Sequence, residues 1–540
     1  MIPLRKRNLY GKKCLSDLIN SNSEQVITDR YTYDAEGRVT SYVNAEGGQW
    51  QLTYNAENQL IEAVQPDGIR NQYSYDVWGN ITQATYAVGT SDERTEQFVY
   101  DAVGNLREYT SPGGIITSYV YDANQRLALV TEAVGTEQER THTFNYNDLG
   151  QIVRYTDPLG NPTEYRYSRD NLVQVRQPLG EDEIATFYEY DLANNLTTVR
   201  LPELLGKTAN TINMAYNALN QRVRFTDTLS NVWAYNYDTS GNVTQVSDPL
   251  GSITRYRYDS NDRLIGTTLP TNAAITYDYD IIGHLSEIVL PNNASGDAQA
   301  VDYGFDRMGR LLTVNNGDGR LTRYQYDSMG RMVSVQQPDG TTISLSYDVQ
   351  GQLVRYGDTQ ISYDADGRVV QLENGRSSIN YTYDALDRVV TVTEQMDDTV
   401  MLSLNYSYDA NNNVLVRQSD DYGTVQYQYD ELGRLISLGN ETHSVTLAYD
   451  TQSHITQLAR SNGITTFYAY DGNGRVVLVQ HFDASNERLE RFDYRYDAIG
   501  NLVRVDRTSA QSEDSAARVT SVLYTYDIAH RLISERWLDG

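Results

Sequence analysis

A short tyrosine-based motif recurs through almost the whole chain and limits what it can fold into. An aromatic anchor, tyrosine in all but one case, occurs 23 times, and eleven of the 22 intervals between anchors are 21 residues long. The other intervals run from 16 to 30 residues. Self-similarity at such a period predicts a repeat array in which each unit packs on its neighbours. We therefore expect residues 29–540 to form one array of 23 units.

Each anchor ends a predicted β-strand and precedes a predicted turn. An aromatic or apolar residue stands two positions before it, so both side chains share one face of a half-buried strand. Aspartate or a similar residue follows, and the fourth position after the anchor is Gly, Asn or Asp in 20 of 23 units. These residues tolerate a left-handed backbone, so D-x-x-G predicts a hairpin turn. Representative anchor positions are Tyr33, Asp34, Gly37, Tyr75, Asp76, Gly79, Tyr326, Asp327, Gly330, Tyr429, Asp430, Gly433, Tyr496, Asp497 and Gly500.

A second strand follows each turn. The sixth position after the anchor is apolar in 22 of 23 units, which predicts an antiparallel strand that brings Leu or Val beside the tyrosine. Arg222 is the exception, and we expect the register there to slip by one so that Val223 takes the place. Turns such as P-D-G at 66–68 and D-P-L-G at 157–160 then reverse the chain again. The expected fold is all-β, an antiparallel meander without helices.

The shape of this meander does not follow from the pattern alone. Twisted sheets of more than about ten strands curl, split or close. An open solenoid, a barrel and a hollow shell all satisfy that rule. The aromatic residues are 45 Tyr, 8 Phe and 4 Trp, and tyrosine hydroxyls require polar partners. We interpret the aromatic stripe as the packing face of the sheet; a semi-polar cavity wall or a glycan-binding surface is the alternative.

Composition excludes several classes of partner. The formal net charge of -28 argues against nucleic acid and anionic membranes, which need a basic footprint. No apolar run is long enough to span a membrane. Cys14 is the only cysteine, so an internal disulfide is excluded. Residues 1–28 are basic, lack the apolar core of a secretory signal and are expected to be a non-repeat leader or linker.

No catalytic, cofactor-binding or metal site is expected. His284 and His454 stand where the repeat usually has Arg or Asn, and His530 occupies the left-handed turn position, so these are repeat substitutions. Paired carboxylates in a tyrosine-lined groove would suit a glycosidase, but turn positions and solvated loops account for the acidic residues. No calcium loop, P-loop or dinucleotide fingerprint is present.

The repeat resembles the YD repeat of bacterial Rhs proteins, of the B and C components of insecticidal Tc toxins, and of animal teneurins. The clearest copies are YSYDVWGNI, YRYDSNDRL, YQYDSMGRM, YQYDELGRL and YRYDAIGNL, which begin at residues 73, 256, 324, 427 and 494. The resemblance implies that the meander spirals into a large hollow β-sheet shell, or cocoon. In bacterial members it also implies an enclosed C-terminal toxin domain. Whether the shell closes stays open.

Two features of the resembled family are missing. Bacterial members end the shell with a core segment carrying further D-P-x-G motifs and an aspartyl self-cleavage site, followed by the toxin. The two D-P-L-G copies here lie in ordinary repeat turns, so Asp157 and Asp248 are not expected to act as proteases. Gly540 falls at a repeat turn, from which we expect the chain to be a piece of a longer or truncated protein.

The expected function is non-catalytic. We predict a shell segment of an Rhs-type toxin that encapsulates a C-terminal effector and is exported from, or displayed on, a bacterium by a dedicated secretion system. The alternatives are a cell-surface adhesion or carbohydrate-binding protein, for which a glycan array is the discriminating test, and a truncated fragment without present function.

Overall fold

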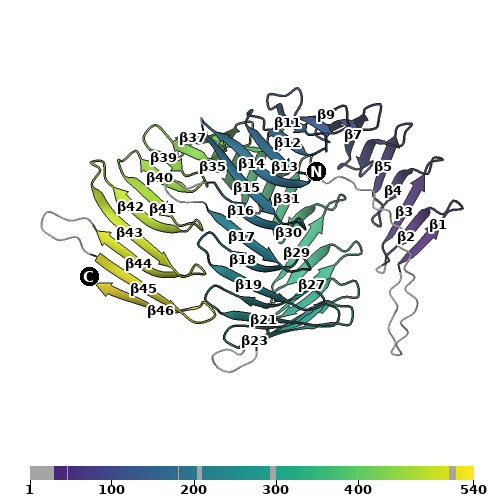
Figure 1. Ribbon diagram of the computed structural model, residues 1–540. Coiled ribbons are helices and arrows are strands. Elements are labelled where there is room, and N and C mark those ends of the chain that lie inside the picture. The colour runs from purple at the N-terminus through teal and green to yellow at the C-terminus, as the bar shows by residue number, and fades with distance from the viewer. Residues whose placement is uncertain are drawn as a thin grey trace.

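A continuous antiparallel β-meander makes up the computed structural model (Figure 1), which describes residues 29–44, 47–180, 182–202, 210–291, 299–397, 399–421, 423–509 and 519–539. Within these ranges the chain forms 46 β-strands and no helix, so the predicted all-β fold is confirmed. The leader predicted over residues 1–28 lies outside the described residues, as do Cys14 and Gly540.

The first 24 strands, which we call round one, are β1 (Arg30–Tyr33), β2 (Val39–Val43), β3 (Gln49–Tyr54), β4 (Leu60–Val64), β5 (Arg70–Tyr75), β6 (Ile81–Tyr86), β7 (Arg94–Tyr100), β8 (Leu106–Thr110), β9 (Ile116–Tyr121), β10 (Leu127–Glu132), β11 (Arg140–Tyr146), β12 (Ile152–Thr156), β13 (Pro162–Ser168), β14 (Asn171–Leu179), β15 (Asp182–Tyr190), β16 (Leu196–Arg200), β17 (Thr211–Tyr216), β18 (Arg222–Thr226), β19 (Val232–Tyr237), β20 (Val243–Ser247), β21 (Ile253–Tyr258), β22 (Leu264–Thr268), β23 (Ala274–Tyr279) and β24 (Leu285–Leu290).

The remaining strands, which we call round two, are β25 (Gln299–Phe305), β26 (Leu311–Asn315), β27 (Leu321–Tyr326), β28 (Met332–Gln336), β29 (Thr342–Tyr347), β30 (Leu353–Tyr356), β31 (Thr359–Tyr363), β32 (Val369–Asn374), β33 (Ser377–Tyr383), β34 (Val389–Met396), β35 (Thr399–Tyr408), β36 (Val414–Ser419), β37 (Gly423–Tyr429), β38 (Leu435–Gly439), β39 (Ser444–Tyr449), β40 (Ile455–Arg460), β41 (Thr465–Tyr470), β42 (Val476–Phe482), β43 (Arg488–Tyr496), β44 (Leu502–Ser509), β45 (Val519–Tyr526) and β46 (Leu532–Asp539).

Every strand pairs only with the strands before and after it in the chain. Each odd-numbered strand and the next even-numbered strand form a hairpin around a D-x-x-G turn, which we call the near turn; the turn that leads to the next hairpin is the far turn. In 22 of the 23 hairpins the anchor lies opposite the sixth residue after it, as Tyr54 does opposite Leu60, with a bulge directly before the anchor. The predicted hairpin geometry is therefore present.

Two details of the predicted register are wrong. Arg222 does not slip, because Tyr216 pairs with Arg222 itself and Val223 does not take its place. The hairpin of β13 and β14 is the one that departs from the common register. In it Tyr167 pairs with Leu172, the fifth residue after it, around a shorter turn in which Arg169 has a φ of 55°. At Arg222 the turn fixes which residue pairs with Tyr216, so the common register is kept although the side chain is arginine.

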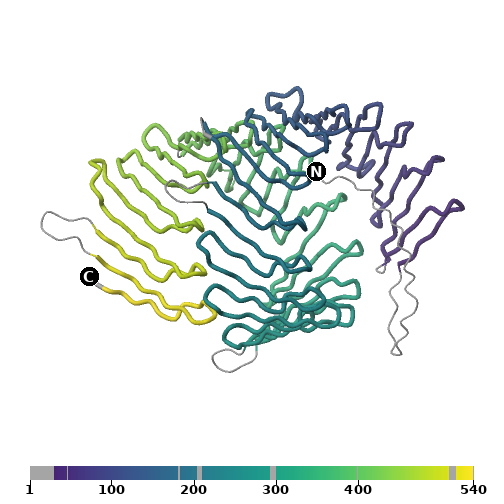
Figure 2. The backbone as a smooth tube through the Cα atoms, in the orientation of Figure 1, coloured from purple at the N-terminus to yellow at the C-terminus, as the bar shows by residue number. Residues whose placement is uncertain are grey.

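The sheet coils into a spiral of about two rounds, as the tube in Figure 2 shows, with the N-terminal strands at one side and the C-terminal strands at the other. Two contacts show how many hairpins make one round of the spiral. The near turn of β27 and β28 touches the far turn between β2 and β3, and the near turn of β37 and β38 touches the far turn between β14 and β15. Each round thus takes about 12 hairpins. At about 4.8 Å between strands, a ring of that size is on the order of 115 Å around and about 37 Å across.

The wall of this spiral is a single layer of sheet. The accessible surface is 33603 Å² for 61.1 kDa, whereas a compact monomer of that mass exposes about 20,000 Å². Only four apolar residues among those described are fully buried, Ala84, Ala87, Ala133 and Val522. The face that carries the anchors, which we call the tyrosine face, is half-buried and the opposite face is exposed, as the alternation along β19 illustrates.

Candidate functional site

The near turn is held by its first aspartate. In the first hairpin, one oxygen of the Asp34 carboxylate accepts hydrogen bonds from the backbone N–H of Glu36 and Arg38, at 3.1 and 2.8 Å. The other accepts one from Nε of Arg38 at 2.6 Å. The backbone N–H of Gly37, at a φ of 81°, donates to the Asp34 carbonyl at 3.1 Å. The aspartate therefore satisfies turn donors that no strand partner reaches.

The other predicted anchor positions have the same arrangement. The backbone N–H four residues after each aspartate donates to its carboxylate at 2.8 to 2.9 Å at Asp76, Asp327, Asp430 and Asp497. The glycines at 79, 330, 433 and 500 have φ values of 73° to 105°. Tyr33, Tyr75, Tyr326, Tyr429 and Tyr496 end β1, β5, β27, β37 and β43.

Hydrogen bonding lowers the pKa of these turn aspartates. At Asp122 the Arg126 side chain and backbone hold the pKa of the carboxyl below its ordinary value. At Asp280 burial opposes the shift, but bonds from His284, Gly283 and Ile282 bring the pKa to about 2. The turns are thus built for the charged carboxylate.

The tyrosine hydroxyl links one hairpin to the preceding one. The hydroxyl of Tyr54 donates to the carbonyl of Val39 at 3.0 Å, and that of Tyr75 to the carbonyl of Leu60 at 2.7 Å. Eighteen anchors make this bond, at 2.6 to 3.0 Å. The acceptor is the residue six after the previous anchor, or Leu172 in the shortened turn. Because strand pairing between hairpins stops short of this carbonyl, the hydroxyl occupies the gap.

The residue after the turn completes the link. The guanidinium carbon of Arg38 lies 5.0 Å from the centre of the Tyr54 ring in the next hairpin, and Arg434 lies 4.8 Å from that of Tyr449. His284 and His454 take the same place: each bonds its turn aspartate, and His454 stacks on Tyr470 at 4.7 Å. Their interpretation as repeat substitutions agrees with this geometry.

The two rounds of the spiral meet along a seam of turns, which is the candidate functional site. The near turns of round two lie against the far turns of round one, and among the described residues eleven hydrogen bonds cross between positions 245 to 284 apart in sequence. No strand pairing crosses the seam within the described ranges. Examples are Asp366 with the N–H of Gly113 at 2.7 Å, and His530 with Asp248 at 2.7 Å.

Some of these contacts leave no space for a larger side chain. A Cβ added to Gly113 would lie 2.0 Å from an oxygen of Asp366. Asp157 and Asp248, the aspartates of the two D-P-L-G turns, both accept seam hydrogen bonds, from Asn411 and His530.

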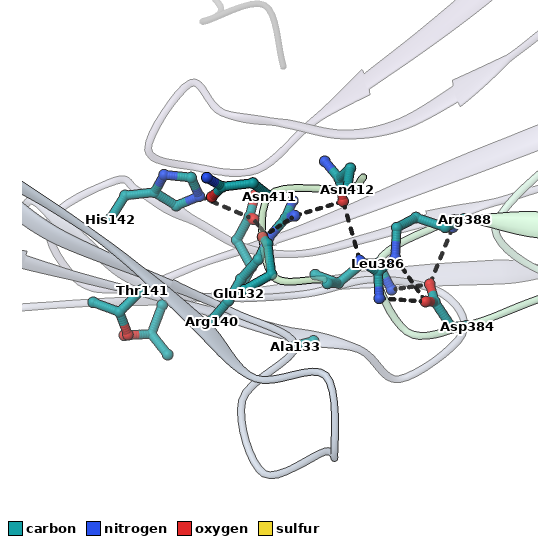
Figure 3. Close-up of polar contacts among 12 residues, drawn as sticks. Glu132, Ala133, Arg140, Thr141, His142, Asp384, Leu386, Arg388, Asn411 and Asn412 are labelled. Carbon is teal, nitrogen blue, oxygen red and sulfur yellow. Dashed lines mark hydrogen bonds and ion pairs between the residues drawn. The ribbon is translucent and has the colours of Figure 1, made fainter. Parts of the chain in front are cut away.

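The most connected seam contact centres on Arg140, at the start of β11 (Figure 3). Its Nε donates to Glu132 at 2.6 Å, and one terminal nitrogen donates to the Ala410 carbonyl at 3.0 Å and to Asn412 at 2.6 Å. Only 11% of the Arg140 side chain is exposed. Its loop, AVGTEQER, nearly repeats AVGTSDER two hairpins earlier, where Ala87 matches Ala133 in a left-handed φ near 52°.

Openings along the seam lie between successive contacts. One, of about 410 Å³, is lined by His142, Tyr155, Asp157 and Asn411; another, of about 840 Å³ beneath the last hairpin, is lined by Trp233, Asp248 and His530. Two further openings, like these two, are formed by residues of both rounds. The seam is thus joined at intervals, with openings between the contacts.

One seam cluster has the outline of a catalytic relay. Glu132, His142 and Tyr155 form a chain, with His142 at 3.4 Å from the carboxylate and 2.8 Å from the hydroxyl. Burial raises the pKa of Tyr155, which opposes a phenolate nucleophile. We assign the hydrogen-bonded group of Glu132, His142 and Tyr155 no catalytic role. No cluster of His, Cys, Asp and Glu suited to a metal ion occurs in the described part of the chain, which holds no helix able to cross a bilayer.

Comparison with known proteins places most of the chain in one group. A family model described as Teneurin YD-shell matches residues 5–138, 271–385 and 374–540, and one described as RHS Repeat matches 146–182, 216–253 and 237–274. A curated relative, the tRNA3(Ser)-specific nuclease WapA of Bacillus spizizenii, is 31% identical over 180 residues, which are 32% of this chain and 7% of that protein.

Solved structures show the same fold. The crystal structure of TcdB2-TccC3 without its hypervariable C-terminal region gives a TM-score of 0.51 at 14% identity, covering 92% of this chain and 32% of that one. The crystal structure of TcdB2-TccC3-TEV gives 0.50 at 14% identity, covering 92% and 31%. The chain thus spans about a third of these structures and a much smaller share of the curated relative.

Proposed function

Because the chain belongs to the Teneurin YD-shell family, we propose that it serves as the wall of a hollow container that encloses a toxin effector until delivery. The observation that carries the proposal is the single-layered wall, which coils around an axis and leaves both faces of the sheet without a covering layer. A sheet of this size that existed only for its own stability would bury one face against a second layer.

The tyrosine face supports the container function. In places its rings stack across neighbouring strands, as Tyr31 does on Tyr42 at 5.0 Å and Tyr42 on Trp50 at 5.1 Å. The hydroxyls of eighteen anchor tyrosines on this face are engaged with backbone carbonyls, as those of Tyr54 and Tyr75 are. Such a surface has little unsatisfied apolar area on which a partner could adhere.

The proposed cargo is a toxin domain outside this chain. The curated relative is named as a nuclease, and this chain matches only a small part of it. The solved neighbours include one described as lacking a hypervariable C-terminal region. We propose the same division here. This chain forms the shell, the effector is a separate domain outside it, and a bacterium exports both together.

Imaging tests the hollow wall directly. Purified chain is examined by electron microscopy of single particles and by small-angle X-ray scattering. We expect a bowl or short tube with an empty centre, and a radius of gyration well above the roughly 24 Å of a compact 540-residue domain. A solid globule with a radius near that value contradicts the proposal.

Enclosure needs its own test. An unstructured tail bearing an epitope and a protease site is fused after Gly540, with the same tail attached to an unrelated monomer as the control. We expect the tail on the shell to be cut at least about tenfold more slowly than the control tail, because the wall excludes the protease. Equal rates would show a wall that encloses nothing.

A further inference from the structure

The near turns form one continuous edge of the sheet, and among the described residues only the half in round two is covered by other turns. In round two the near turns lie in the seam, where apolar residues at their second and third positions, such as Leu386, Leu432 and Ile499, are half-buried. In round one the near turns face away from the seam, and no seam hydrogen bond in the described ranges involves them. They form the open edge at the N-terminal side of the spiral.

Six of the twelve turns on the open edge carry large exposed apolar side chains, and four others carry the exposed residues Glu36, Glu57, Asp170 and Asp262. Eight large apolar side chains on these turns are exposed by 64% to 107%, whereas the most exposed ones on the described near turns of round two, Met308 and Ile528, reach only 43% and 55%. The eight are Val77, Trp78, Val103, Leu149, Leu192, Leu219, Ile281 and Ile282. Neither the D-x-x-G turn nor the tyrosine link needs these side chains. An apolar edge of this extent marks an interaction surface.

The chain itself shows what such an edge fits and what it does not fit. Within the seam, near turns are covered by far turns that carry proline and leucine, such as Pro158 and Leu229. The free far turns of round two, in the described ranges, carry exposed acidic residues without large apolar side chains as exposed as those eight; the acidic residues include Asp339, Asp420, Asp421, Glu441 and Glu487. Burying those carboxylates against an apolar edge would be unfavourable, so copies are not expected to stack head to tail.

We propose that two copies of this chain associate edge to edge, through the near turns of round one, in a twofold-symmetric dimer. A spiral edge is carried onto itself by a twofold axis perpendicular to the spiral, so the edges of two identical spirals match along their length. Such a contact is isologous and closed. The acidic far turns of round two then lie at the two outer ends, far from each other.

The available area is sufficient for a stable dimer. A fully buried large apolar side chain corresponds to about 60 to 120 Å² removed from water, so eight per copy give on the order of 1,400 Å² for the pair. Specific interfaces bury about 1,200 to 2,000 Å². The inference concerns this edge and does not depend on the cargo.

The test measures the mass of the full chain in solution. By sedimentation equilibrium at rising concentration we expect a transition from 61.1 kDa to twice that mass. The triple variant Trp78→Asp, Leu192→Asp and Ile281→Asp is expected to weaken dimerisation by more than about 100-fold. These side chains are exposed by at least 75%, so an unchanged thermal midpoint is expected and checks that the variant is folded.

A matched control separates the edge from added charge. Gln51→Glu, Gln97→Glu and Gln428→Glu add the same three charges at exposed positions of the opposite face and are expected to leave the dimer intact. A wild-type chain that stays monomeric, a triple variant that still dimerises, or growth beyond two copies would overturn the proposal. So would a monomer that floats with phosphatidylcholine vesicles only when the edge is apolar, because the edge would then bind lipid.

Discussion

Neighbouring hairpins and neighbouring rounds are joined in different ways. Between hairpins, strand pairing continues through the whole sheet, and most links are reinforced by a tyrosine hydroxyl on a carbonyl. Between rounds, only turn residues meet, through separate polar contacts with openings between them. The comparison teaches that the wall is continuous around the spiral and discontinuous along its axis, so it can part at the seam without losing the sheet.

Alkaline pH is expected to have the largest effect, because it acts on the links between hairpins. Burial raises the pKa of anchors such as Tyr75 and Tyr121 above the ordinary value of 10.0. A raised pKa in the folded state contributes stability that is complete below pH 10.0 and is lost as the pH rises through the folded pKa. The chain has only four lysines and arginine stays charged, so tyrosine dominates this range.

Urea unfolding followed by circular dichroism at pH values from about 8 to 12 measures this effect, around the reference pKa of tyrosine. We expect a level midpoint up to about pH 10 and a cooperative loss above it. A midpoint that stays level to about pH 12 would show that the hydroxyl links contribute little.

Removing one hydroxyl is expected to have an intermediate effect. Tyr326→Phe leaves the Leu311 carbonyl without its 2.8 Å donor and should lower the free energy of unfolding by about 0.5 to 1.5 kcal/mol. Phe305 offers the reverse change, because its ring occupies an anchor position without a hydroxyl. Phe305→Tyr should therefore be neutral or stabilising. An equal loss of unfolding free energy in both variants would contradict a contribution from the hydroxyl bond, since it would indicate an effect of ring packing alone.

The smallest change in global stability is expected at the seam. Arg140→Met removes the bonds to Ala410 and Asn412 but leaves all strand pairing intact. Global unfolding should shift by about 1 kcal/mol or less, whereas amide exchange in the near turn of β35 and β36 should accelerate by about tenfold. Arg154→Met is the matched control, because Arg154 only approaches Glu164, at 3.9 Å. Equal amide exchange rates in both variants would show that Arg140 does not stabilise the seam.

The sequence predicted the hairpin because the rules for a hairpin are local. Left-handed φ values at Gly37 and Gly330, and also at Gln125, Ser453 and His530, follow from turn chemistry within five residues. The same local pattern carried the resemblance to the YD-repeat family, which the family models confirm. The register predicted at Arg222 was wrong because it was inferred from the polar side chain, whereas the turn fixes the backbone pairing whatever residue follows it.

The links between hairpins and between rounds were not predicted. Tyrosine in place of phenylalanine indicated a polar partner, but the carbonyl that accepts its hydroxyl depends on strand spacing beyond the hairpin. The seam joins residues at least 245 positions apart, through turn positions that vary from Asp366 to Asn473. A recurring slot can be read from one repeat, whereas contacts between rounds require the curvature of the whole sheet.

The period of about 12 hairpins has a consequence for how such a protein changes in evolution. Width is set by the curvature that each hairpin adds, so duplicating or deleting a unit of about 21 residues leaves the bore unchanged. The added unit advances the end of the coil by about a twelfth of a round and moves every later turn onto a new neighbour across the seam. Capacity therefore grows in small steps of height, and each step must be matched by compatible residues one full round away.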